Sequence, residues 1–349
     1  MDVQLGLFPD EPTVDADPPV DSVRLSAEAR RLASRLPKTV RMGTSSWSFP
    51  GWEGIVYGGH ASQTRLARHG LEAYARHPLL GTVGLDRTYY RPISADDFSA
   101  YADAVPRAFR FLVKAHRLVT SPTDPEAYGV RSPNPHFLDP LYAADAIVGP
   151  AWEGLGRKAG PILFQFSPFH PNQVGGRESF LERLHRFLDA LPDGPLYAVE
   201  LRTPAFLVKQ YADVLEATGV AHCYNVHPAM APLERQLAVL SPFYQPALVI
   251  RWMLHSGLEY EAAKDRYQPF DRLVDEDPTS RELIARAVLD ATIAERPAFV
   301  IANNKAEGSA PLSVFRLAER IADWAPDSSA HSEPEHEPTD NSKVSPHAP

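Results

Sequence analysis

Residues 196–227 read LYAVELRTPAFLVKQYADVLEATGVAHCYNVH, and the architecture can be inferred outward from this segment. A short apolar run over residues 196–202 leads into a longer amphipathic stretch over residues 204–218, and a second apolar run follows at residues 221–227. Short apolar runs predict buried strands, and the amphipathic stretch between them predicts a helix. The segment therefore predicts two parallel strands joined by a helical crossover.

The same alternation extends over residues 38–325. Eight apolar runs predict strands at residues 41–47, 82–89, 109–116, 162–166, 196–202, 221–227, 248–252 and 299–304. Helical stretches lie between them at residues 63–76, 95–105, 178–190, 204–218, 281–294 and 311–324, and Ser94 is a good N-cap for the second of these. No glycine-rich dinucleotide-binding motif follows any run, which argues against an open doubly wound sheet. We therefore expect a single-domain α/β fold, a TIM-type (β/α)₈ barrel.

Within residues 38–325, two segments are longer than the connections between strands and helices require. The two ends of the chain do not show the strand–helix alternation at all. Residues 117–140 and 254–278 read as lids or insertions over the barrel mouth. Residues 1–37 and 326–349 are rich in proline and polar residues, so we expect a mobile N-terminal arm with a short helix at 26–36, and a disordered tail. The formal charge is −9, but the two ends carry −3 and −4, which leaves the barrel nearly neutral.

Composition also limits the compartment and the partners. No run approaches the ~18 apolar residues that a membrane helix needs, and the N-terminus lacks an apolar signal core. The single cysteine, Cys223, excludes an intramolecular disulfide and a multi-cysteine zinc site. We expect a cytoplasmic protein without a membrane partner, and the nearly neutral barrel leaves direct nucleic-acid binding open.

Polar side chains close every predicted strand. In a barrel of this class the chemistry lies at the C-terminal strand ends, so these side chains are candidate site residues. Lys114 and His116 close the third run and share a face, as do Glu200 and Arg202 on the fifth. Each alone is also explained by a loop cap or a structural ion pair, but convergence on one rim favours a site. The further strand-end candidates are Ser45, Asp86, Gln165, Asn225, His227, Arg251, Asn303, Asn304 and Lys305.

Positive charge predominates on this rim, which predicts a substrate carrying a phosphate or a carboxylate. Glu200 beside an arginine stays ionised and suits a base or an electrostatic stabiliser, with Asp86 as a further catalytic candidate. Lys114 or His116 would then supply the proton. A Schiff-base role for Lys114 is an alternative that ranks lower, because nearby Glu200 favours the protonated amine.

A metal site and an aromatic platform are two further possibilities at the rim. Asp86, His116, Glu200 and His227 could hold a metal, but the neighbouring lysine and arginines oppose it, and the chain contains no HExxH. We expect neither a metal nor another cofactor. Aromatic residues after the first two strands, which include Trp47, Trp52 and Tyr90, either pack as core or stack on a sugar or base.

Six segments of the barrel resemble the YecE-like family, domain of unknown function 72. They are GTSSWSFPGWEGIVY (43–57), TYYRP (88–92), FRFLVKAHRLVT (109–120), GPILFQFSP (160–168), VELRTPAF (199–206) and NNKAEGSAP (303–311). The resemblance implies a TIM-type barrel without an assigned reaction. It also implies pocket roles for Ser45, Trp47, Trp52, Tyr90, Lys114, His116, Gln165, Glu200, Arg202, Asn303, Asn304 and Gly308.

The chain departs from the family pattern on three strands. Gly84 and Asp86 stand where the family usually has a glutamate and then an asparagine, and Thr203 and Lys305 stand where it often has histidine. A mechanism that uses those family groups would have to use Asp86 and Lys305 here.

A short peptide in the N-terminal arm resembles the pentapeptide with which bacterial replication and repair proteins bind the sliding clamp. It consists of Gln4, Leu5, Gly6, Leu7 and Phe8, and Gly6 departs at the third place. Apolar anchors on a mobile arm can order into a hydrophobic groove, although they could instead dock on the barrel.

The leading hypothesis is a metal-independent barrel enzyme of the hydrolase or lyase type that acts on an anionic, phosphate- or sugar-containing or nucleotide-like substrate. The clamp peptide would link it to DNA maintenance. The alternatives are a non-catalytic adaptor tethered to the clamp, and a small-metabolite enzyme unrelated to DNA.

Overall fold

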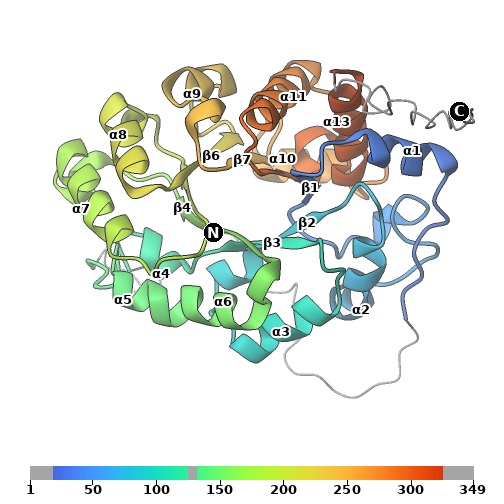
Figure 1. Ribbon diagram of the computed structural model, residues 1–349, viewed down its shortest axis with the longest axis horizontal. Coiled ribbons are helices and arrows are strands. Elements are labelled where there is room, and N and C mark those ends of the chain that lie inside the picture. The colour runs from blue at the N-terminus through green and yellow to red at the C-terminus, as the bar shows by residue number, and fades with distance from the viewer. Residues whose placement is uncertain (1–18, 125–131, 325–349) are drawn as a thin grey trace, which may run out of the picture.

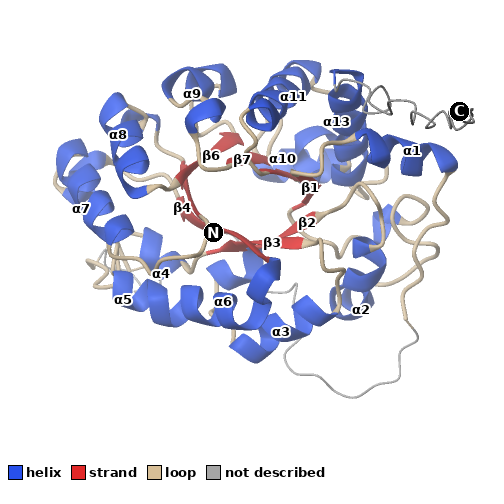
Figure 2. Cartoon of the chain, in the orientation of Figure 1, coloured by secondary structure: helices blue, strands red, loops and turns tan. Residues whose placement is uncertain are grey.

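The computed structural model describes residues 19–124 and 132–324, and a closed barrel of eight parallel strands forms its centre (Figure 1). The strands follow one another around the barrel in chain order, and β8 pairs with β1 to close it. Figure 2 shows the strands as an inner ring and the helices as an outer ring. The predicted TIM-type (β/α)₈ barrel is therefore confirmed. The strands are β1 (Val40–Thr44), β2 (Thr82–Leu85), β3 (Arg110–Lys114), β4 (Ala159–Phe166), β5 (Tyr197–Leu201), β6 (Ala221–Val226), β7 (Leu248–Trp252) and β8 (Ala298–Ala302).

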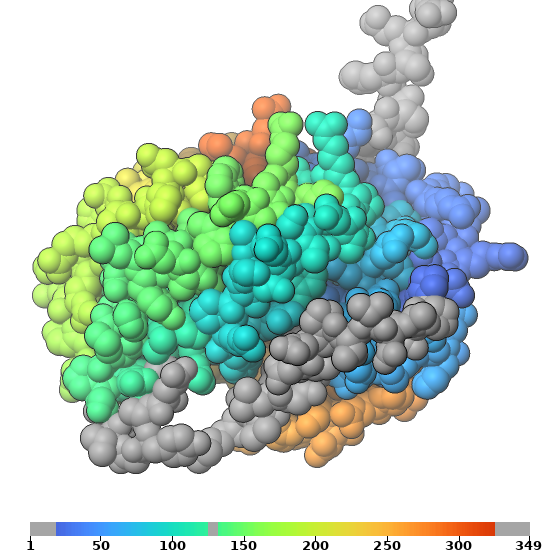
Figure 3. Space-filling view, turned by 90° about the horizontal axis from the view of Figure 1, so that it is seen from below, coloured from blue at the N-terminus to red at the C-terminus, as the bar shows by residue number. Residues whose placement is uncertain are grey.

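The helices that cover the barrel follow the predicted places with a few additions. Helices α4, α5, α6, α9 and α12 are not among the predicted helices. Helix α10 lies within the segment expected to be a lid or insertion. Figure 3 shows one flank of the barrel, where α3 in teal lies beside α6 in green. None of the described helices combines the length and apolar composition needed to cross a membrane. The helices are α1 (Ala27–Arg35), α2 (Gln63–Ala75), α3 (Ala95–Asp103), α4 (Arg117–Thr120), α5 (Pro140–Ala143), α6 (Gly149–Leu155), α7 (Arg177–Asp189), α8 (Lys209–Thr218), α9 (Leu233–Val239), α10 (Tyr260–Tyr267), α11 (Pro278–Ile293), α12 (Asn304–Glu307) and α13 (Ala310–Trp324).

The N-cap predicted at Ser94 is confirmed. The Ser94 hydroxyl accepts a hydrogen bond from the Asp97 amide at 3.1 Å, and the Asp97 carboxylate accepts one from the Ser94 amide, also at 3.1 Å. This reciprocal pair forms a capping box, which satisfies two amides at the start of α3 that have no partner within the helix.

The barrel interior explains where the site lies. A small apolar cluster fills the barrel, separate from the larger core between strands and helices. Successive strand residues point to opposite faces, so the side chain two positions after an inward residue also points inward. Six apolar members of the inner cluster are followed in this way by polar residues at the C-terminal strand ends. These residues are Lys114, Gln165, Glu200, Asn225, Arg251 and Asn303.

Part of the expected N-terminal arm packs against the barrel. Val20 is buried, and the Gly58 amide donates to the Asp21 carbonyl at 2.8 Å. The predicted short helix forms as α1, which contacts α13 through a hydrogen bond from Arg35 Nη2 to the Ala322 carbonyl at 2.7 Å. Residues 19–37, which belong to the arm expected to be mobile, thus make backbone and side-chain contacts with the barrel and with α13. The expected mobility of residues 1–18 and of the tail concerns residues outside the described range.

The segment that leads to α10 and on to α11 reaches the barrel mouth, as the sequence predicted for residues 254–278. The turn of α12 secures its end, because the Glu307 carbonyl accepts hydrogen bonds from the amides of Val274 and Asp275 at 2.8 and 3.2 Å. Gly308, with φ of 119°, sits where a side chain would meet the Arg272 carbonyl at 2.6 Å. The turn of α12 follows directly on Asn303 at the end of β8, so it connects the segment of residues 254–278 to the C-terminal end of that strand.

Candidate functional site

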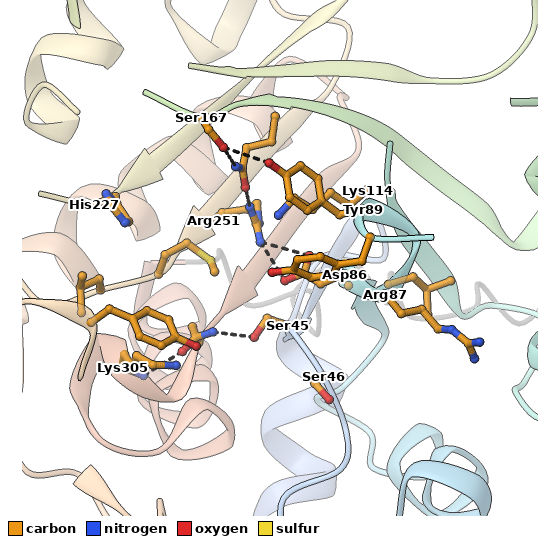
Figure 4. Close-up of a pocket in the computed structure, with 18 of the residues that line it drawn as sticks. Ser45, Ser46, Asp86, Arg87, Tyr89, Lys114, Ser167, His227, Arg251 and Lys305 are labelled. Atoms are coloured by element: carbon orange, nitrogen blue, oxygen red, sulfur yellow. Dashed lines mark hydrogen bonds and ion pairs between the residues drawn. The ribbon is translucent and has the colours of Figure 1, made fainter. Parts of the chain in front are cut away.

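A cavity of about 400 Å³ opens at the C-terminal ends of the strands. All eight strands, or the residues directly after them, contribute to its wall. Figure 4 shows the labelled side chains of this wall, with Arg251 central, Lys114 and Asp86 on one side and Lys305 on another. The cavity therefore lies where a TIM barrel places its chemistry.

Arg251 is the centre of the charged network at the cavity floor. Its Nη1 donates to Glu200 Oε2 at 2.7 Å and to Gln165 Oε1 at 3.0 Å. Its Nη2 donates to the two carboxylate oxygens of Asp86 at 3.3 and 3.2 Å. Burial lowers the pKa of Arg251, but the charges of Glu200 and Asp86 outweigh burial and raise it overall. Arg251 therefore stays charged and joins residues from β4, β5, β7 and the turn after β2.

Glu200 lies beneath the cavity and does not line it. Its side chain is fully buried, and Arg202 Nε donates to its Oε1 at 2.5 Å while Arg251 occupies Oε2. Burial raises the pKa of Glu200, but the charges of Arg202 and Arg251 overcome burial and lower it to about 2. A carboxylate with both oxygens engaged is a poor proton acceptor, so this geometry suits an electrostatic stabiliser and a positioning residue better than a base.

Lys114 projects from the end of β3 into the cavity wall. Its Nζ lies 3.8 Å from the centroid of the Tyr89 ring. No hydrogen bond or ion pair within the described part of the chain engages this amine. Burial lowers the pKa of Lys114 to about 8; Asp86 acts against this shift, and Arg251 adds to it. The amine is thus close to a proton-transfer pKa for neutral solution.

The opposite wall carries Lys305, Asn303 and His227. Lys305 Nζ lies 3.9 Å from the centroid of the Tyr260 ring, and Asn303 Nδ2 donates to Ser45 Oγ at 2.8 Å. His227 Nδ1 accepts from the Ala229 amide at 3.0 Å. Burial, with Arg202 nearby, lowers the pKa of His227 to about 4, so its ring is neutral at pH 7.

The structure brings most of the predicted site residues together and leaves six away from the cavity wall. Those in the wall are Ser45, Trp47, Asp86, Tyr90, Lys114, Gln165, Arg202, His227, Arg251, Asn303 and Lys305. Those that do not line it are Trp52, His116, Glu200, Asn225 and Asn304, and Gly308 does not line it either.

Trp52, Asn304 and Asn225 form hydrogen bonds below the rim. Trp52 Nε1 donates to Asn304 Oδ1 at 3.2 Å, and the Ala310 amide donates to the same oxygen at 2.8 Å. Asn225 Nδ2 donates to the Leu201 carbonyl at 3.0 Å. All three side chains are buried, so their contacts stabilise the rim from below instead of facing a ligand.

His116 is placed differently from the sequence expectation. Strand β3 ends at Lys114, and His116 instead precedes the first turn of α4, so the alternation that put the two side chains on one face no longer applies. Its Nδ1 lies 2.8 Å from the Tyr142 hydroxyl and its Nε2 lies 3.3 Å from the Tyr90 carbonyl. A proton from His116 would have to reach the cavity through another group.

Several wall residues were not among the predicted site residues. Tyr89 covers Lys114, and it comes directly before Tyr90 at the end of the second predicted strand. Ser167 follows Gln165 at the spacing that keeps side chains on one face, and this spacing is the sequence signal that points to it. Tyr260 comes from α10, and nothing in its local sequence marks it for the site.

The cavity wall carries cationic side chains, neutral hydrogen-bonding groups and the carboxylate of Asp86, which Arg251 binds. Within residues 19–124 and 132–324, no three histidine, cysteine or carboxylate side chains come close enough to hold a metal ion. The side chains of Ser45, Gln165, Ser167 and Asn303 offer neutral hydrogen bonds beside the cations.

The fold and the cavity together define a TIM-type barrel with a polar cavity at its mouth. The model of a family described as "Protein of unknown function DUF72" matches residues 41–338, and the chain belongs to this family. The resemblance to YecE-like proteins, which rested on six segments, is confirmed.

Solved structures of the family share the fold. A DUF72 family protein from Enterococcus faecalis V583 is 18% identical, with a TM-score of 0.56, and the match covers 81% of this chain and 95% of that one. A DUF72 family protein from Thermotoga maritima MSB8 is 20% identical, with a TM-score of 0.52, and the match covers 81% and 98%. No curated protein matches the chain.

Proposed function

We propose that the protein is an enzyme that binds an anionic, phosphate- or sugar-containing small molecule at the barrel mouth and acts on it by hydrolase or lyase chemistry. One observation carries the proposal: two buried cationic side chains, Lys114 and Arg202, line the cavity, while the acidic groups beside them are already paired.

The pairing leaves positive charge for a ligand. Arg251 engages both Glu200 and Asp86, and Arg202 uses only its Nε for Glu200. Among the described residues, the Arg202 Nη atoms and the Lys114 amine have no hydrogen-bond partner. Leaving a buried cation without a counter-ion is costly, so these groups favour an anion in the cavity.

The remaining wall suits a compact polar ligand. A volume of about 400 Å³ accommodates a molecule of the size of a sugar phosphate or a nucleotide fragment. Ser45, Gln165 and Asn303 offer hydrogen bonds to hydroxyl groups, and Trp47 and Tyr90 offer aromatic surface.

Lys114 is the group best suited to move a proton. General acid-base catalysis is most efficient when the pKa lies near the working pH, and the pKa of Lys114 is about 8. Glu200 and Arg251 act through Lys114 and Arg202 as positioning residues.

A thermal-shift screen of anionic and neutral small molecules tests the binding part of the proposal. Inorganic phosphate, sugar phosphates, nucleotides and carboxylic acids should raise the melting temperature, and the corresponding neutral sugars should do so less. Lys114→Met should reduce the response to anions, whereas Lys209→Met, which removes the same charge from an exposed position on α8, should retain it. Equal responses of the two variants would count against the proposal, and turnover of a responding compound tests the enzymatic part.

A further inference from the structure

We propose that Lys114 is a nucleophile that forms a covalent iminium, or Schiff-base, adduct with a carbonyl compound bearing a phosphate or carboxylate group. The inference rests on the proposed function, because the anionic part of the compound would occupy the same cavity. It goes further by naming the substrate class and the bond that forms.

The geometry isolates the amine from any group that would hold its proton. Lys114 Nζ lies over the Tyr89 ring, whose face attracts a cation but cannot accept its proton as a carboxylate can. Lys114 is 7% exposed and lines the cavity. The amine is therefore accessible to a small ligand and screened from bulk solvent.

From the sequence alone, the negative charge of Glu200 is expected to keep Lys114 protonated, which opposes Schiff-base formation. In the folded protein that charge is shared by Arg202 Nε at 2.5 Å and Arg251 Nη1 at 2.7 Å. Asp86, the other nearby acid, is bound by Arg251 Nη2. The two arginines thus offset both carboxylates that would favour the ammonium form.

The shift of the lysine pKa agrees with this arrangement. Burial is its largest cause, and Arg251 and Arg202 lower the pKa of Lys114 against the opposite effects of Asp86 and Glu200, to about 8. At pH 7.4 about a fifth of such an amine is neutral, compared with about one in a thousand for an ordinary lysine. Desolvation of this kind is a known way to activate a lysine nucleophile.

Arg202 is placed to bind the phosphate or carboxylate group of the carbonyl compound. Its side chain lines the same cavity, and within the described part of the chain only its Nε is engaged, by Glu200. A planar guanidinium binds carboxylate and phosphate through paired hydrogen bonds. A compound with a carbonyl and an anionic group can therefore engage Lys114 and Arg202 together.

The bond changes balance without a cofactor or an oxidant. The ammonium first releases a proton to water in the cavity, and the lone pair of Nζ attacks the carbonyl carbon to form a C–N bond. The attacking nitrogen then loses a proton and the carbonyl oxygen takes one up, which gives a neutral carbinolamine. Loss of that oxygen as water, with a second proton, leaves the positively charged iminium, so that ammonium and carbonyl yield iminium and water.

Reductive trapping tests the adduct in the full-length protein. The protein is incubated with glyceraldehyde 3-phosphate, pyruvate or the neutral control glyceraldehyde, reduced with sodium borohydride, and mapped by peptide mass spectrometry. We expect one stable adduct on Lys114 with the anionic probes, at least ten times less with glyceraldehyde, and suppression by excess inorganic phosphate. The yield in the wild type should rise with pH through about 8.

Variants and peptide mapping distinguish an adduct on Lys114 from adducts on other lysines and from anion binding without an adduct. Lys114→Arg should lose the adduct, and Lys209→Arg should retain it. Should Lys114→Arg fail to fold, the pH dependence and the mapped position in the wild type still decide. An adduct on Lys305, or on exposed lysines alone, would overturn the inference. Stabilisation by phosphate without any adduct on Lys114 would overturn the iminium and leave the proposed anion site intact, whereas the absence of both would overturn both.

Discussion

Arg251 and its two carboxylate partners, Glu200 and Asp86, form a charge network at the barrel mouth. This network determines how single substitutions there change stability. Glu200 accepts hydrogen bonds from two arginines that come from different parts of the chain. Removing one partner of a buried charge network leaves the others uncompensated, which costs more than the network contributes as a whole. The consequences of single substitutions follow from this asymmetry.

Glu200→Gln is expected to lower the free energy of unfolding by about 3–5 kcal/mol, because it leaves Arg202 and Arg251 facing a neutral amide. Urea denaturation at pH 7 measures the change. Glu282→Gln removes a carboxylate that pairs at the surface with Arg320 and Arg286 and should have a much smaller effect. Equal effects of the two substitutions would show that the buried network is unimportant for stability.

The same carboxylate gives an acid-dependent loss of stability. The pKa of Glu200 falls from 4.5 to about 2 on folding, so its stabilising contribution is fully present above about pH 4.5. It is lost as the pH falls toward about 2. The difference in stability between wild type and Glu200→Gln should therefore shrink over this range, as measured by denaturation at a series of pH values; a constant difference would contradict the assignment.

Lys114 is expected to reduce stability, as a group kept for chemistry commonly does. The pKa of Lys114 is 10.5 in the unfolded chain and about 8 in the folded one. The charged amine therefore lowers the free energy of unfolding by its full amount below about pH 8, and this effect disappears above about pH 10.5. Lys114→Met should raise the free energy of unfolding at pH 7 by up to about 3 kcal/mol. Denaturation at pH 7 and pH 10 should show this gain shrinking; a destabilised Lys114→Met protein at pH 7 would refute it.

Among the secondary-structure elements, the strands were easier to predict than the helices. Strand runs are almost wholly apolar because both faces of a parallel barrel are covered, and β7 forms with the predicted bounds. Errors arose at strand ends, where β2 stops at Leu85 and a 3₁₀ turn carries Asp86 to Tyr89. Such a change depends on contacts of the turn with its neighbours, including the hydrogen bond from Thr88 Oγ1 to the Leu85 carbonyl at 2.8 Å.

Helix α3 offers a test of a locally encoded element. Ser94→Ala removes the hydroxyl that caps the helix and should lower the free energy of unfolding by about 1 kcal/mol. Ser99→Ala, at an exposed position within the same helix, should leave stability unchanged or slightly higher. Urea denaturation of both variants measures the difference, and similar values would show that the capping box contributes nothing.

In the molecule as a whole, the N-terminal peptide remains a separate question from the barrel. Residues 4–8 lie outside the described range, and their binding to a sliding clamp is a prediction from their sequence alone. The full-length protein should be retained by an immobilised bacterial sliding clamp. Leu7→Ala combined with Phe8→Ala should abolish retention, because these side chains are the apolar anchors. Asp10→Asn serves as the control, and an equal loss in both proteins would contradict a specific peptide contact.

The order of residues along the chain was enough to predict the barrel, its eight strands and the polar side chains at their ends. These features follow from local periodicity, which a single strand or helix already displays. The proximity of Glu200 and Arg202 could be expected from their spacing on one strand. The contacts of Arg251 with Glu200 and Asp86, the separation of His116 from Lys114 and the isolation of the Lys114 amine became visible only in the folded barrel. Asp86 and Arg251 are 165 positions apart, and their contact depends on the distance between side chains across a closed barrel, which local sequence does not encode.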